Sequence, residues 1–117
     1  MRPGQSLRLL LLLAAAAVSA DHQPAVSGAN PEAPSERGKE VFTTIAQPPC
    51  GACHTLADAG TVGTTGPNLD EQQPTEEDAK LIVTEGAGVM PGYGPLLTQE
   101  QIDAVAAYVS SVAGQSQ

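Results

Sequence analysis

Residues 50–54 read Cys50-Gly51-Ala52-Cys53-His54. A Cys-x-x-Cys-His segment is the attachment signature of c-type haem. The spacing lets one helical turn present both sulfur atoms to the vinyl groups on one edge of the porphyrin. The histidine then lies over the centre of the ring, where it can bind iron. The segment predicts one haem c per chain, bound covalently through Cys50 and Cys53.

Three other interpretations of the two cysteines remain open. A thiol oxidoreductase pair has the same spacing, but it normally lies in an α/β fold, and this sequence shows no strand pattern. A zinc site needs four ligands, and the sequence offers only Cys50, Cys53, His54 and the distant His22. A structural disulfide leaves His54 and the thin supply of core side chains unexplained.

Composition bounds the fold and the kinds of partner. The 117 residues include one Phe, two Tyr and no Trp, which suggests that a non-peptidic group fills part of the core. Length allows one domain, and two cysteines exclude a disulfide-dense scaffold. Thirteen acidic residues against five basic ones give a net charge of −8. No basic patch is available for phosphates, so we expect no nucleic-acid partner.

The N-terminus has the pattern of an export signal. Arg2 and Arg8 precede the apolar run Leu9–Val18, and Val18-Ser19-Ala20 supplies the small residues of a cleavage site. This predicts a secretory signal peptide over residues 1–20 and a periplasmic location. The alternative is an uncleaved leader that tethers the chain to the outer face of the cytoplasmic membrane, although a span needs about 20 apolar residues.

A tether and one domain are expected after the leader. Residues 21–35 contain three prolines and no hydrophobic periodicity, which is typical of a disordered Pro/Gly-rich tether. The domain then spans residues 36–117. Without the leader, three basic residues face thirteen acidic ones, a net charge of −10.

Hydrophobic periodicity predicts three main helices and no strands, and therefore a small all-α fold. The first helix has one apolar face, an N-cap at Ser35 and a stop at Pro48-Pro49. Its apolar face consists of Gly38, Val41, Phe42 and Ile45.

The other two helices are predicted from their ends. The second opens with a capping-box pattern at Thr75 and ends at Gly86, and the third opens with one at Thr98 and ends at Gly114. Residues 55–74 and 86–97 are left as long loops, which are usually functional.

Met90 is the candidate for the second axial ligand. It is the only methionine outside the leader, and it lies in a Gly/Pro-rich loop that is a poor place for mere packing. A thioether can bind haem iron. We therefore predict His54 and Met90 as the metal ligands; His22 competes only if the tether folds back.

Residues 36–114 resemble a class I cytochrome c of the short bacterial monohaem type. The shared motifs are Gly38-x-x-x-Phe42, Cys50-x-x-Cys53-His54, Gly66-Pro67-Asn68-Leu69, Val89-Met90-Pro91 and Val105-x-x-Tyr108. The resemblance covers essentially the whole domain. It implies a cytochrome c fold with long loops around the haem.

The resemblance also implies specific contacts. Gly38 and Phe42 of the first helix would cross Val105 and Tyr108 of the last, where glycine permits a close approach. The Pro67 carbonyl would accept a hydrogen bond from the ring N–H of His54, and Leu69 would pack on the haem edge. The short His54-to-Met90 segment implies an exposed haem edge. Partners for the propionates are not identifiable among so few basic residues.

The predicted function is one-electron transfer by a monohaem carrier with His/Met ligation. Both axial positions are filled, so we expect no catalytic residues and no enzyme activity. The alternative is a haem-based enzyme or gas sensor in which Met90 detaches. The acidic excess, densest over residues 70–78, favours redox partners with basic or neutral docking faces. We expect a monomer.

Overall fold

The computed structural model describes residues 34–115. The predicted leader and all but the last two residues of the predicted tether lie outside this range. The helices are α1 (Pro34–Glu40), α2 (Leu69–Gln72), α3 (Glu76–Glu85) and α4 (Gln99–Val112). Strands β1 (Thr55–Leu56) and β2 (Thr61–Val62) form a small antiparallel sheet. A π-helical turn over Val41–Ile45 continues α1, and short 3-10 turns cover Cys50–Ala52 and Ala57–Ala59.

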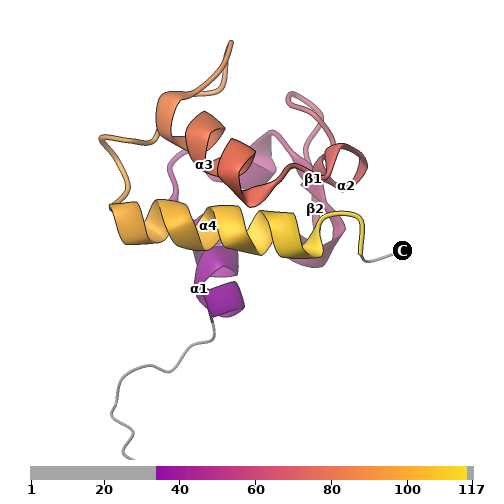
Figure 1. The fold of residues 1–117 in the computed structure, drawn as a ribbon. Coiled ribbons are helices and arrows are strands. Elements are labelled where there is room, and N and C mark those ends of the chain that lie inside the picture. Colours follow the sequence, from indigo (N-terminus) through magenta and orange to yellow (C-terminus); the bar gives the residue numbers. More distant parts are fainter. Residues whose placement is uncertain (1–33, 116–117) are drawn as a thin grey trace, which may run out of the picture.

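Helix α4 is the axis of the domain. Figure 1 shows it crossed by α1 on one side, with α3 on the other and the sheet and α2 near its C-terminal end. Where α1 crosses it, a Cβ on Gly38 would collide with the Ala104 carbonyl oxygen and with Tyr108. Phe42 meets Tyr108 edge to face, with ring centroids 6.0 Å apart. The implied helix crossing is confirmed.

The three predicted helices are present, and their ends follow local rules. The Thr75 hydroxyl accepts a hydrogen bond from the Asp78 amide at 3.0 Å. Thr98 and Gln101 form the full reciprocal capping box. The first helix ends ahead of Pro48-Pro49, with a π-type bond from the Ala46 amide to the Val41 carbonyl. The N-cap prediction at Ser35 is wrong, because Ser35 lies inside α1.

The long loop predicted over residues 55–74 holds structure that the sequence analysis missed. The all-α, three-helix prediction therefore holds only coarsely: the domain is mostly helical, but it has a fourth helix and a sheet. Helix α2 is a single turn capped by Asn68, whose Oδ1 accepts the Asp70 amide at 2.9 Å. Each strand has only two residues, too few for alternation to show.

One apolar cluster joins most of these elements. Its aromatic members, Phe42, Tyr93 and Tyr108, are almost completely buried, and half-buried Cys50 and Met90 pack against the cluster. The full cluster is Val41, Phe42, Ala46, Leu56, Leu69, Tyr93, Leu97, Ile102, Val105, Tyr108, Val109 and Ala113. Within residues 34–115, no helix is long and apolar enough to cross a membrane.

Candidate functional site

One helical turn carries both cysteines. The Cys53 and His54 amides donate to the Cys50 carbonyl at 3.2 Å and 3.0 Å, which closes the turn. Both thiols are free and half-buried. The predicted arrangement, with two sulfurs on one turn followed by a histidine, is therefore present, and the disulfide interpretation has no support.

His54 is buried and held in one orientation. Its Nδ1 lies 2.8 Å from the Pro67 carbonyl oxygen. A carbonyl can only accept, so Nδ1 carries a proton, and in the neutral ring the lone pair is then on Nε2. The backbone at Gly66 lies close to the ring, since a Cβ there would be 2.7 Å from the ring Cε1 atom. The hydrogen bond implied by the family resemblance is confirmed.

The β1–β2 hairpin supports the same turn from the other side. The Thr61 hydroxyl donates to the His54 carbonyl at 2.9 Å. The Gly66 amide donates to the Cys53 carbonyl at 2.7 Å. A Cβ on Gly63 would be 2.6 Å from the Cys53 carbonyl carbon. Sequence analysis missed Thr61 and Gly63, because a Thr/Gly-rich stretch carries no periodic signal.

Met90 lies on a tight hairpin after α3. Ala87 and Met90 exchange two backbone hydrogen bonds, of 3.1 Å and 2.9 Å. Gly88 has φ +60° at the turn, and Val89 at the tip is 85% exposed. Met90 itself is half-buried against the core cluster. The hairpin thus presents Val89 to solvent and keeps the thioether at the core.

Tyr93 connects the Met90 hairpin to the segment that precedes Cys50. Its ring is 3% exposed, and its hydroxyl donates to the Pro48 carbonyl at 2.6 Å. Burial, with the nearby thiols of Cys50 and Cys53, raises the pKa of Tyr93 to about 12. The hydroxyl therefore remains a proton donor at neutral pH. In the sequence, Tyr93 stands out only as one of three aromatic residues.

The thiol chemistry argues against a thiol oxidoreductase pair. Burial raises the pKa of Cys50 to about 11, although its own backbone lowers that pKa and Cys53 adds a further rise. The thiolate is the reactive form of a redox thiol, and buried structural cysteines are inert. Within residues 34–115, no three His, Cys, Asp or Glu side chains are grouped to hold a metal ion, and the fourth candidate zinc ligand, His22, lies outside the described residues.

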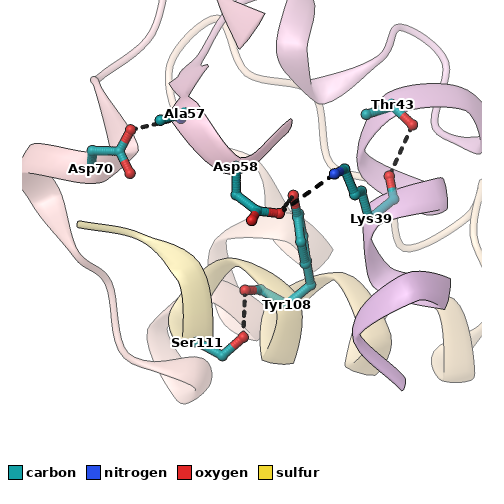
Figure 2. Close-up of polar contacts among 7 residues, drawn as sticks. All are labelled: Lys39, Thr43, Ala57, Asp58, Asp70, Tyr108 and Ser111. Carbon is teal, nitrogen blue, oxygen red and sulfur yellow. Dashed lines mark hydrogen bonds and ion pairs between the residues drawn. The ribbon is translucent and has the colours of Figure 1, made fainter. Parts of the chain in front are cut away.

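A polar network ties the segment after His54 to α4 and α1. Figure 2 shows Asp58 between Tyr108, whose hydroxyl donates to it at 2.7 Å, and Lys39, whose Nζ lies 3.7 Å away. Burial and this hydrogen bond raise the pKa of Tyr108. Asp70 accepts the Ala57 amide at 2.7 Å and the Gly114 amide at 2.8 Å.

A surface hollow lies over this network. Its volume is about 570 Å³, and side chains of α1 and α4 contribute to its lining. None of the predicted ligands lines it. The hollow is therefore separate from the candidate site.

The donor groups of the candidate site fit a c-type haem. Two free thiols share one turn, an imidazole keeps a free Nε2, and a thioether lies at the same core cluster as Cys50. These groups match the attachment and ligation chemistry of haem c. The bulky ring would also supply apolar volume to a core with three aromatic side chains.

Known proteins match this chain both in a family model and in a solved structure. Residues 33–109 match the family model described as cytochrome c oxidase, cbb3-type, subunit III. The crystal structure of the c-type cytochrome SorU from Sinorhizobium meliloti is 51% identical, with a TM-score of 0.67. That match covers 69% of this chain and 92% of SorU. No match was found among curated proteins.

The matches confirm the cytochrome c fold and the family resemblance drawn from the motifs. The family model spans most of the chain, and the SorU match covers nearly all of that protein. Members of the family hold haem c covalently and transfer electrons. The chain belongs to this family as a small class I c-type cytochrome.

Proposed function

We propose that the protein is a one-electron carrier with one haem, attached through Cys50 and Cys53 and ligated by His54 and Met90. The observation that carries the proposal is the 2.8 Å contact between His54 Nδ1 and the Pro67 carbonyl. It fixes the tautomer in which Nε2 is free to bind iron. The bound group would supply the reversible Fe(II)/Fe(III) couple.

The protein's own residues orient the ligand and tune its strength. A histidine that donates its second ring N–H to a carbonyl is a more basic ligand with a fixed ring plane. Gly66 allows the backbone to approach the ring closely enough for this contact. Pro67 and Gly66 would therefore act on a bound iron through His54.

Ligation by Met90 would complete the coordination. With both axial positions filled, no site remains for a substrate or for oxygen, which favours a carrier over an enzyme. A thioether also raises the reduction potential relative to a second histidine. The half-buried position of Met90 against the same cluster as Cys50 supports this assignment.

A haem-based sensor or enzyme is the second candidate function. It requires Met90 to leave the iron, and one observation favours such mobility: the neighbouring Val89 is 85% exposed at the tip of the hairpin. The two candidates differ in one property. A carrier keeps Met90 bound in both oxidation states, whereas a sensor releases it.

Charge supports a partner with a basic or neutral docking face. Thirteen acidic residues oppose three basic ones after the leader. Lys80 lies 3.7 Å from Glu76 and 3.6 Å from Asp103, so its positive charge is partly compensated. A field of this sign would steer a basic partner toward the protein.

We also propose that the protein acts outside the cytoplasm, as a monomer. Support comes from the leader pattern over residues 1–20 and the Pro-rich stretch over residues 21–35. Haem attachment to cysteine thiols takes place after export, which agrees with this order of segments. An uncleaved leader would leave the domain on a tether at the outer face of the cytoplasmic membrane.

Carbon monoxide binding tests the proposed function. The reduced protein should show no spectral change with carbon monoxide, because Met90 occupies the site. The Met90→Ala variant should bind carbon monoxide readily and serves as the positive control. Binding by the unmodified protein as tight as that by the variant would contradict the carrier and support the sensor.

A further inference from the structure

The hairpin that carries Met90 makes most of its hydrogen bonds within itself and to α3. Ala87 and Met90 pair with each other. The Tyr93 amide donates back to the Val83 carbonyl of α3 at 2.8 Å, and Gly94 donates to Thr84 at 3.1 Å. These bonds hold the loop to α3, but not to the turn that carries Cys50 and His54.

One hydrogen bond crosses between the two sides. Within residues 34–115, the bond from the Tyr93 hydroxyl to the Pro48 carbonyl is the only one that joins residues 75–97 to residues 46–74. At 2.6 Å it is short. Tyr93 lies three residues after Met90, and Pro48 lies two residues before Cys50, so the bond spans the candidate site.

The surroundings of Tyr93 make this bond hard to replace. The ring belongs to the buried core cluster, and at 3% exposure its hydroxyl has little access to water. A buried hydroxyl without a partner is costly, so the closed arrangement is favoured. Swinging the hairpin outward would break the bond with Pro48.

We propose that Tyr93 is a positioning residue, whose bond to Pro48 holds the Met90 hairpin against the Cys50–His54 turn and limits release of the thioether from the iron. This inference rests on the proposed ligation by Met90. An external ligand can bind only when the hairpin opens, so its apparent affinity follows the open fraction. Removing the hydroxyl should raise that fraction about three- to tenfold.

The chain offers a closely matched control. Tyr108 is 2% exposed, and its hydroxyl donates at 2.7 Å to Asp58, on the side of α4 that faces α1. Tyr93→Phe and Tyr108→Phe each remove one hydroxyl from a buried ring of the same size. Only the first change cuts the link across the site.

The experiment is an imidazole titration of the oxidised holoprotein, followed by its optical spectrum. Tyr93→Phe should bind imidazole about three- to tenfold more tightly than the unmodified protein, and Tyr108→Phe should bind it within about twofold. Circular dichroism should show native helix content in both variants. Equal affinities in the two variants, no change in Tyr93→Phe, or an unfolded Tyr93→Phe chain would each overturn the positioning role.

A third variant separates this inference from the function on which it rests. If Met90 is the ligand, Met90→Ala should bind imidazole much more tightly than either tyrosine variant. Unchanged imidazole binding in Met90→Ala would overturn the ligation itself, and the Tyr93 inference with it. Tighter binding in Met90→Ala with no effect in Tyr93→Phe would overturn the Tyr93 inference alone.

Discussion

The two sides of the candidate site are built to different degrees of rigidity. On the His54 side, the ring is fixed by Pro67, its carbonyl accepts from Thr61, and its amide donates to Cys50. On the other side, within residues 34–115, the backbone of Met90 itself hydrogen-bonds to Ala87 alone, and the adjacent Val89 is 85% exposed. Ligand exchange should therefore begin at Met90.

The difference in rigidity follows from how the backbone is arranged around each ligand. On the His54 side, the sheet and the 66–67 turn converge on one short helical turn, and glycines let the backbones touch. On the Met90 side, a single hairpin leaves the end of α3 and returns. With Met90 as ligand, the imidazole would be the fixed partner of the iron and the thioether the one held by fewer contacts.

Removing both cysteines should have the largest effect, because the protein should then lose its haem and, with it, both sides of the site. Cys50→Ser with Cys53→Ser removes covalent attachment, and the remaining peptide has three aromatic side chains for its core. Haem binding stabilises the folded state by linkage, so the double variant should be largely unfolded by circular dichroism, with no haem mass retained. Single Ser110→Ala, at a half-buried position on α4, is the control. Native helicity in the double variant would show that the peptide core suffices.

Two glycine-to-alanine variants should show that the two sides differ in rigidity. Gly66→Ala would place a methyl group 2.7 Å from the His54 ring and should cost about 2–3 kcal/mol of unfolding free energy. Gly88→Ala, at φ +60° with open space around it, should cost about 1 kcal/mol through backbone strain. Denaturant unfolding measures both. A larger loss for Gly88→Ala would contradict the assignment of rigidity to the His54 side.

The smallest expected effect concerns the side against which a partner docks. Glu76 and Glu77 begin α3, which leads to the Met90 hairpin, whereas Glu36 and Glu40 lie on α1 beside the separate hollow. Two glutamate-to-glutamine changes at either pair alter the charge equally. Only the double variant in α3 should make the electron-transfer rate fall less steeply as salt is added. The reason is that screening acts over about 10 Å at 0.1 M salt, so charges far from the docking side have little effect.

Stopped-flow rates with a basic acceptor, measured over a series of ionic strengths, test this. An acidic acceptor should instead react faster as salt is added. Equal effects of the two glutamate pairs would mean that the acidic charge acts on the partner from the whole surface. The docking side would then not be the one nearest Met90.

The sequence predicted the features that have a fixed spacing or extend over several turns, and it did not predict the shorter ones. Cys50–His54 is read from spacing alone, and the helices at Thr75 and Thr98 have caps and several turns of periodicity. Helix α2, with one turn, and the two-residue strands fall below any periodic signal. The Tyr93–Pro48 bond joins residues 45 positions apart, so no local pattern could indicate it.

The iron–sulfur charge-transfer band of the oxidised protein tests the central claim most directly. Ligation by His54 and Met90 predicts that the band is present in the unmodified holoprotein and is lost in Met90→Ala, with haem still covalently attached. A band that survives in Met90→Ala, or one absent from the unmodified protein, would contradict methionine ligation.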